Sequence, residues 1–205
     1  MKQKVYVKKP INIAITGKIG TGKTTVCNLL KKEGFQVFES DKEIKKIFEK
    51  KEVNLLIVKI FSKQIKNLLN SEGYINKKAL SSYVFSNKKE LNKLEQILYP
   101  FLEKQKERFK RKNISKKIIF FDVPLLFEKK LHEAYDKIIF LKVNKETQRE
   151  RVLKRKDMDE IKLKKILLNQ RYNLNFFKKF ISLEIDSSKT KPQIVKELRL
   201  FIKML

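Results

Sequence analysis

Several ingredients of an average globular chain are scarce here. The 205 residues include five glycines, four prolines, one cysteine and no tryptophan. The single Cys27 excludes an internal disulfide framework, and no apolar run approaches the roughly 18 residues of a membrane-spanning helix. The first ten residues are basic, but they contain neither the apolar core of a secretory signal nor the arginines of a transit peptide. We therefore expect a cytoplasmic protein that has no membrane partner.

Acidic residues and arginine are also few. The chain has 50 basic and 23 acidic residues, a formal net charge of +27, yet only seven of the basic residues are arginine. Such a charge favours nonspecific contact with polyanions. However, lysine is spread along the whole chain, no nucleic-acid-binding module is visible, and the bias towards Lys, Ile, Asn and Phe fits an AT-rich genome. We expect no dedicated nucleic acid partner and leave open whether the charge has a function of its own.

The few glycines are concentrated in one place. Three of the five, Gly17, Gly20 and Gly22, fall within six residues, although about fourteen would be expected in the whole chain at an average usage of about 7%. The stretch from Gly17 to Thr24 fits G-x-x-x-x-G-K-[ST], the P-loop pattern. An apolar run at 11–16 reads as a buried strand before it, and 25–32 reads as a helix closed by Gly34. This is the context that the motif requires.

The chemistry of the motif explains its residue types. Successive backbone N–H groups at a helix N-terminus form a concavity for phosphate oxygens, and side chains in the wrong place would block it. Lys23 is positioned to supply a flexible positive charge to the β and γ phosphates, and the hydroxyl of Thr24 to ligate Mg²⁺. The sequence thus predicts a nucleotide site that uses ATP and Mg²⁺.

Strand and helix patterns alternate along the rest of the chain. Apolar runs at 35–38, 118–123 and 137–143 and a weaker one at 183–186 read as further strands. Helical spacing is found at 145–156, 159–173 and 191–204. The alternation predicts an α/β fold with a parallel sheet covered by helices on both faces.

The segment 43–115 lacks a convincing strand and shows helical spacing. We interpret it as a helical insertion that binds an acceptor, set between two parts of a nucleotide-binding core, 1–42 and 116–205. A polar stretch at 156–160 suits a mobile lid, which we place at about 149–171.

Two carboxylates follow predicted strands, at the edge of the sheet where ligands gather in open α/β folds. Asp41 comes shortly after the second strand, and there it could take up or orient the proton of an acceptor hydroxyl. The alternative is that Asp41 only caps the following helix; neighbouring Glu39 has no preferred reading. Asp122 ends the third strand, where it could hold Mg²⁺ directly or through water, or could equally well bond loop amides.

Four of the seven arginines lie between 149 and 171. Arg151 and Arg155 are four residues apart, so we expect them to share a helix face and to contact phosphates, a bidentate role that lysine cannot copy. Arg149 reads as a surface residue. We expect Cys27 to be a core residue and assign His132 no role.

At this point the motifs resemble those of one family, the dephospho-coenzyme A kinases. The stretch Thr16–Thr25 is similar to the family's T-G-G-I-G-S-G-K-S-T, and Val37–Asp41 to its V-I-D-A-D. The most specific stretch, Asp122–Glu128, reads D-V-P-L-L-F-E and matches the family's D-x-P-L-L-F-E. The similarity covers nearly the whole chain from Ile11.

The resemblance implies a P-loop kinase fold with a helical substrate-binding insertion and a lid. It also implies phosphorylation of the ribose 3′-hydroxyl of dephospho-coenzyme A by ATP, the last step of coenzyme A synthesis. Asp41 and Lys23 would be catalytic, Thr24 and Asp122 would hold the metal, and Gln170 would lie near the nucleotide. The ATP-binding set would comprise Gly20, Thr21, Gly22, Lys23, Thr24, Thr25, Arg151 and Arg155.

Four positions depart from the family pattern. Lys18 replaces a glycine and can add a phosphate contact, whereas Tyr99 and Glu39 replace a His and an Asp. Ser187 stands where the family has Asn, at a position that the resemblance places on the adenine side. Two alternatives remain open from the residues: another P-loop kinase of a nucleoside or nucleotide, and a basic nucleic-acid-binding protein that depends on ATP. We expect a monomer or weak oligomer that acts on a small-molecule substrate.

Overall fold

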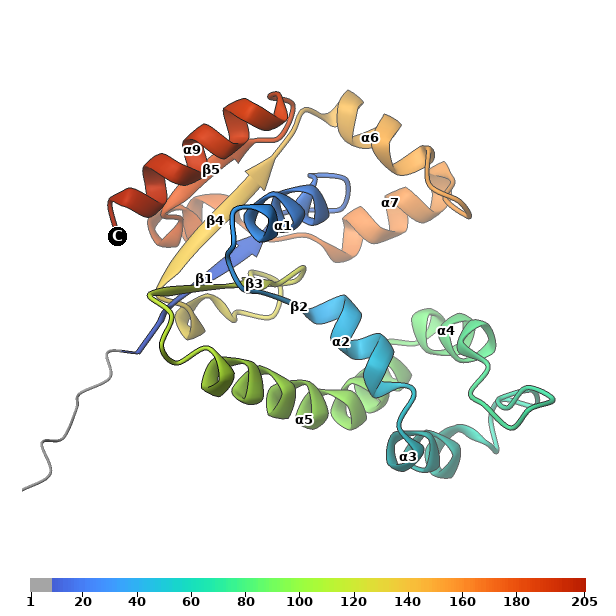
Figure 1. Ribbon diagram of the computed structural model, residues 1–205. Helices are drawn as coiled ribbons and strands as arrows, with labels where there is room; N and C mark the ends of the chain where they lie inside the picture. The colour runs from blue at the N-terminus through green and yellow to red at the C-terminus, as the bar shows by residue number, and fades with distance from the viewer. Residues whose placement is uncertain (1–8) are drawn as a thin grey trace, which may run out of the picture. The chain divides into compact units, whose positions relative to one another are not determined.

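A five-stranded parallel sheet forms the centre of the protein (Figure 1). The structure is a computed structural model and describes residues 9–205. The strand order is β2-β3-β1-β4-β5, and every neighbouring pair is parallel. The strands are β1 (Ile11–Thr16), β2 (Val37–Glu39), β3 (Ile118–Asp122), β4 (Lys137–Lys142) and β5 (Leu183–Asp186). Because β1 lies between β3 and β4, the loop that follows it begins at the middle of the sheet's carboxyl edge.

Both faces of the sheet are covered, as the continuous apolar runs predict. On one face, helices α1 (Lys23–Lys32) and α9 (Lys191–Lys203) pack over β1, β4 and β5, with fully buried contacts from Ile15, Leu30 and Ile185. On the other face the contacts are largely aromatic. Phe127 stacks on Phe177 with ring centroids 4.6 Å apart and also meets Phe140 of β4 at 6.0 Å. The predicted α/β class is confirmed.

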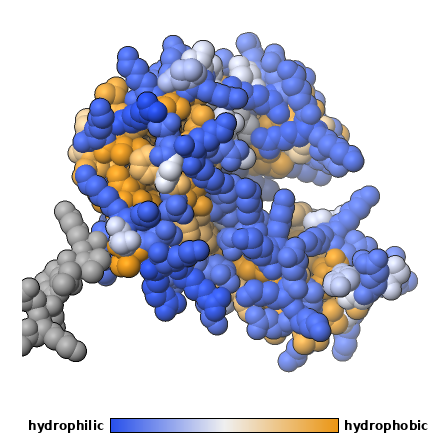
Figure 2. All heavy atoms as spheres, viewed as in Figure 1, coloured by the Kyte–Doolittle hydropathy of each residue, from blue (hydrophilic) through white to orange (hydrophobic). Residues whose placement is uncertain are grey.

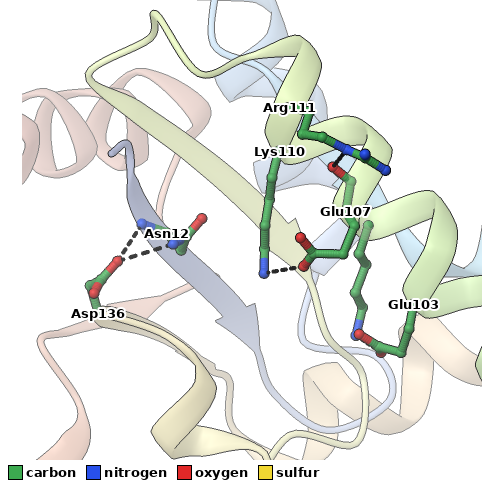
Figure 3. A network of polar contacts seen from close by, with 7 residues as sticks. Asn12, Glu103, Glu107, Lys110, Arg111 and Asp136 are labelled. Carbon is green, nitrogen blue, oxygen red and sulfur yellow. Dashed lines mark hydrogen bonds and ion pairs between the residues drawn. The ribbon is translucent and has the colours of Figure 1, made fainter. Parts of the chain in front are cut away.

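An aspartate links β1 and β4 at the amino-terminal end of the strands. Oδ2 of Asp136, just before β4, accepts hydrogen bonds from the backbone N–H of Asn12 at 2.7 Å and from its side-chain amide at 3.3 Å (Figure 3). The backbone N–H of Asp136 in turn donates to the carbonyl of Asn12 at 3.0 Å. These bonds set the register between β1 and β4 at the edge opposite the glycine-rich loop.

The chain divides into two compact units, one made of 9–39 and 113–205 and the other of 40–112. The second unit is helical and has a core of its own, in which Ile57, Phe61 and Leu80 are almost completely buried. Its helices are α2 (Ser40–Ile47), α3 (Lys51–Phe61), α4 (Lys77–Ser86) and α5 (Lys88–Lys112). Extended pairing within it is limited to one isolated bridge between Leu69 and Ile75. Its role in binding an acceptor stays a prediction.

The long helix α5 shows how the basic surface is arranged. Lys110 Nζ donates to the carboxylate of Glu107 at 2.9 Å, and Arg111 Nε donates to the carbonyl of the same glutamate at 3.4 Å (Figure 3). Lys106 and Lys93 each pair with a glutamate three residues earlier. These acidic residues offset part of the repulsion along a helix rich in lysine.

After β4 come α6 (Lys145–Leu153), α7 (Glu160–Asn169) and α8 (Leu174–Phe177). Single-turn 3₁₀ helices occur at His132–Ala134 and Lys178–Phe180. The expectation that a helix runs to 156 was wrong. The helix ends at Leu153 because the chain turns, with the N–H of Arg155 on the carbonyl of Val152, and Asp157 then takes a left-handed φ of 62°. Asp159 begins α7 by accepting the N–H of Lys162 at 2.7 Å.

The early end of α6 corrects the interpretation of two arginines. Arg151 is in the last turn of α6, whereas Arg155 lies beyond it in an exposed turn. They therefore do not share a helix face. Within residues 9–205, no helix has the length and apolar character that crossing a bilayer demands.

Candidate active site

The glycine-rich loop between β1 and α1 lies tightly against the end of β4 and against α6. Gly17 has a φ of 150°, and a Cβ there would lie 2.5 Å from the carbonyl oxygen of Leu141. Gly20 has a φ of 81°, and a Cβ there would lie 2.8 Å from Cγ2 of Val152 in α6. Neither position has room for a side chain, and both backbone conformations disfavour one. Contact with β4 at Gly17 and with α6 at Gly20 therefore requires glycine at these two positions.

Lys23 is the first residue of α1, and its side chain folds back over the loop. Its Nζ donates to the carbonyl of Gly17 at 2.6 Å and lies 3.4 Å from that of Lys18. The hydroxyl of Thr21 donates to the same Lys18 carbonyl at 2.7 Å. Thr24 and Thr25 follow in the exposed first turn of α1. This helix N-terminus has no acidic residue in its first turn, so its backbone N–H groups and the ammonium form a strongly electropositive concavity.

The two strand-end carboxylates lie side by side in the sheet. Asp122 is the last residue of β3 and is 7% exposed; in the strand register it is opposite both Ile15 of β1 and Glu39 of β2. Glu39 forms an ion pair with Lys31 of α1. The ion pair links the end of β2 to α1, a structural contact of Glu39 that the sequence did not predict.

Asp41 belongs to the helical unit, where it is the second residue of α2 and is exposed. It comes two residues after the end of β2. Because α2 begins at Ser40, Asp41 lies inside the first turn and is not the N-cap residue. A carboxylate in the first turn is favoured by the helix dipole. Its assignment as the catalytic carboxylate stays a prediction.

The arginines predicted to contact phosphates differ in their positions. Arg151 lies beside the loop: its guanidinium donates to the hydroxyl of Ser187 at 2.9 Å and to the carbonyl of the same residue at 2.8 Å. The two side chains also flank Gly22, where a Cβ would lie 3.5 Å from that of Ser187. Arg155 is exposed and makes no such contact with the loop, while Arg149 forms an ion pair with Glu160 of α7.

Ser187 follows β5, at the place where the sequence pattern of the family has Asn. In this chain its hydroxyl and carbonyl together hold a guanidinium in a fork geometry. The substitution therefore keeps a polar contact at this edge of the loop.

Two glutamines complete the surroundings of the loop. Gln148 of α6 donates from Nε2 to the carbonyl of Ile19 at 2.6 Å, and the N–H of Ile19 donates to Oε1 of Gln170 at 2.8 Å. Gln170 is 6% exposed and caps the end of α7. Sequence reasoning pointed to Gln170 only through the resemblance and missed Gln148, because a single amide carries no motif.

A cavity of about 790 Å³ is lined in part by Gln148. Leu163 and Leu167 of α7 line one wall, and Lys18 and Thr21 come from the loop. The Lys18 ammonium lies 5.5 Å from the ring centroid of Tyr172, a cation–π contact. Lys18, which departs from the family pattern, is thus held against the segment after α7.

Glu128, the last residue of the D-V-P-L-L-F-E stretch, lies in the field of the loop lysines. Burial raises the pKa of its carboxyl, and the charges of Lys23 and Lys18 partly oppose that shift. Burial also raises the pKa of the Tyr172 phenol, and the nearby Glu128 raises it further. The stretch thus brings a half-buried carboxyl within the electrostatic influence of Lys23 and Lys18.

Two residues that the sequence left without a site role are in the core. Cys27 is fully buried in α1, and burial raises the pKa of its thiol, which keeps it protonated and unreactive. His132 is 7% exposed and meets the rings of Phe177 and Phe180 at 5.0 and 4.4 Å. The prediction that Cys27 is a core residue is confirmed.

Comparison with known proteins decides the family. A sequence model described as dephospho-CoA kinase matches residues 11–175. The chain belongs to the dephospho-CoA kinase family. A dephospho-CoA kinase of Fusobacterium nucleatum subsp. nucleatum is 37% identical over 167 residues, which are 82% of this chain and 84% of that protein. The resemblance drawn from the sequence motifs is confirmed, and with it membership of a family of ATP-dependent kinases that act on a small molecule.

Solved structures agree with this placement. A dephospho-CoA kinase from Campylobacter jejuni superposes with a TM-score of 0.64 at 27% identity, covering 94% of this chain and 96% of its own. A protein of known structure from Thermus thermophilus gives a TM-score of 0.81 at 24% identity, covering 97% and 99% of the two chains. The second likeness supports the fold alone. The expected P-loop kinase fold of the dephospho-CoA kinase family is confirmed.

Proposed function

We propose that this chain transfers the γ-phosphoryl group of ATP to the ribose 3′-hydroxyl of dephospho-coenzyme A and so produces coenzyme A. The observation that carries the proposal is the glycine-rich loop over which Lys23 folds, in a chain that matches the family along 11–175. Loop amides at a helix N-terminus and a mobile ammonium suit a nucleoside triphosphate. The D-V-P-L-L-F-E stretch favours this acceptor over those of other P-loop kinases.

The proposed division of labour follows from position. The N–H groups from Gly20 to Thr25 and the Lys23 ammonium would hold the phosphates of ATP. Arg151, already beside Gly22, would neutralise charge that develops on the transferred group, and the exposed Arg155 would join it from the turn after α6. Asp41 would orient the 3′-hydroxyl and take up its proton. The reaction then relies on positioning and charge stabilisation.

The residues around the loop suit Mg²⁺. Thr24 offers a hydroxyl at the start of α1, and Asp122 offers a carboxylate at the end of β3, both of them hard oxygen donors. Within residues 9–205 no group of three His, Cys, Asp or Glu side chains could hold a metal ion by itself. This agrees with Mg²⁺, which commonly keeps several waters and binds through one or two protein ligands and substrate phosphates. When bound, Mg²⁺ neutralises phosphate charge.

The helical unit, 43–115 in the sequence-based division, would bind the acceptor, and segment 149–171 would act as the lid. We further propose a cytoplasmic enzyme that is a monomer or weak oligomer. The lysine-rich surface needs no nucleic acid partner in this account.

The proposal is tested by measuring ADP release with a panel of acceptors under identical conditions. We expect turnover with dephospho-coenzyme A to exceed turnover with nucleoside monophosphates by several orders of magnitude. Absence of turnover that depends on dephospho-coenzyme A would refute the specific activity. Comparable rates with a nucleoside or nucleotide would instead support the alternative of another P-loop kinase.

A further inference from the structure

One residue of the glycine-rich loop, Ile19, is held on both its backbone N–H and its backbone carbonyl by side-chain amides. The carbonyl of Ile19 accepts from Nε2 of Gln148 at 2.6 Å, and the N–H of Ile19 donates to Oε1 of Gln170 at 2.8 Å. The two glutamines come from α6 and from the end of α7, which are 129 and 151 residues away from Ile19 in sequence. Side chains from α6 and from the end of α7 thus converge on a single residue of the loop.

The bond to the Ile19 carbonyl has a geometric consequence for the next residue. A trans peptide is planar, and its C=O and N–H point in opposite directions. The peptide that carries the Ile19 carbonyl also carries the N–H of Gly20. When Gln148 holds the carbonyl, it fixes the direction of the Gly20 N–H and points it away from α6.

The packing around Gly20 leaves little freedom for this peptide to turn. A Cβ at Gly20 would lie 3.0 Å from the carbonyl oxygen of Gln148 and 3.1 Å from its Cγ. The backbone and side chain of Gln148 therefore border the same peptide that its amide holds. Gln170 is 6% exposed, so its bond to the Ile19 N–H is shielded from competing water.

We propose that Gln148 and Gln170 form an amide clamp on Ile19 that orients the Gly20 N–H towards the phosphates of the nucleotide and couples α6 and α7 to the loop. Both glutamines are positioning residues, because they act through the backbone of Ile19: Gln148 holds the Ile19–Gly20 peptide, and Gln170 holds the Lys18–Ile19 peptide that precedes it. The proposed orientation of the Gly20 N–H towards phosphates rests on one part of the proposed function, namely that the loop binds ATP. It does not depend on the identity of the acceptor.

A double-mutant cycle on nucleotide binding tests the clamp. Gln148→Met and Gln170→Met preserve side-chain length and remove the amide. We expect each to weaken binding of a non-hydrolysable ATP analogue, measured by titration calorimetry, by about three- to tenfold, the range for one hydrogen bond. Because both bonds hold one residue, the two substitutions should not act independently, as for sites that share a partner. We expect the fold-loss of affinity in the double variant to be smaller, by a factor of at least about two, than the product of the two single fold-losses.

A matched control and a recovery variant complete the design. Gln105→Met on α5 makes the same substitution at a glutamine without either contact, and it should bind the analogue like the unaltered chain. Gln148→Lys keeps a donor that can reach the Ile19 carbonyl, and it should recover most of the affinity lost in Gln148→Met. Thr147→Lys, made in the Gln148→Met variant, adds the same charge one residue away on α6. It should not recover analogue affinity by the factor that separates Gln148→Lys from Gln148→Met.

Several results would overturn the clamp. These are single Met variants that bind within twofold of the unaltered chain, strictly multiplicative losses, or an equal gain from Thr147→Lys. If circular dichroism shows that Gln170→Met does not fold, the comparison of Met and Lys at position 148 decides alone. Because the analogue needs no acceptor, failure of the clamp is distinct from failure to phosphorylate dephospho-coenzyme A.

Discussion

At the scale of single residues, the proposed chemistry divides between a cation at the loop and a carboxylate in α2. The Lys23 ammonium lies over the start of the loop, 2.6 Å from the Gly17 carbonyl. A lysine in this position can follow the phosphates, because its stem is flexible and its charge is compact. Asp41 lies in the helical unit, so it can act on an acceptor without contributing to the loop.

These different positions predict different kinetic defects. We expect Asp41→Asn to lower kcat by about 100-fold or more, the size of general-base effects, with little change in the dissociation constant for ATP. Lys23→Ala should lower kcat and also weaken ATP binding. Steady-state kinetics together with calorimetric titration of the ATP analogue separate the two. Turnover at the unaltered rate in Asp41→Asn would show that its assigned role is wrong.

At the scale of elements, the sequence predicted the positions of strands best, because apolar runs and glycines mark where they begin and end. All five strands lie where the runs placed them, with β2 shifted to Val37–Glu39. The predicted end of α6 was wrong because the helical spacing at 145–156 continues past Leu153, whereas the chain turns there, with the N–H of Arg155 on the carbonyl of Val152. The amides of Gln148 and Gln170 could not be found from spacing, because their partner is a distant backbone.

Two glycines with similar backbones offer a test of how closely α6 packs on the loop. Gly20 and Gly34 have φ of 81° and 85°, but a Cβ at Gly34 would meet nothing within 4 Å. We expect Gly34→Ala to reduce the free energy of unfolding by about 1–2 kcal/mol, the cost of left-handed backbone for a residue with a Cβ.

Gly20→Ala should cost about 1–3 kcal/mol more, the usual range for overpacking, because its Cβ would meet Val152 at 2.8 Å. Urea unfolding of both variants followed by circular dichroism measures the difference. Equal losses would mean that α6 yields at this contact and that the loop is not tightly packed there.

At the scale of the whole molecule, the positive charge and the clustered glycines are distributed differently. The net charge of +27 is spread over lysines on both units, and hydrophilic residues cover much of the face shown in Figure 2. Three of the five glycines, Gly17, Gly20 and Gly22, by contrast lie where β4, α6 and Ser187 approach the loop. The family assignment rests on the match of residues 11–175 to the family model, and the net charge adds nothing to it.

The most direct test of the central claim is the position of the transferred phosphate. The chain is incubated with dephospho-coenzyme A and ATP labelled with ¹⁸O in the γ-phosphoryl group, and the product is examined by mass spectrometry and ³¹P NMR. We predict one labelled phosphomonoester on the ribose 3′-oxygen, formed in equal amount to ADP. ADP release without a labelled acceptor, or a label on another oxygen, would contradict the account.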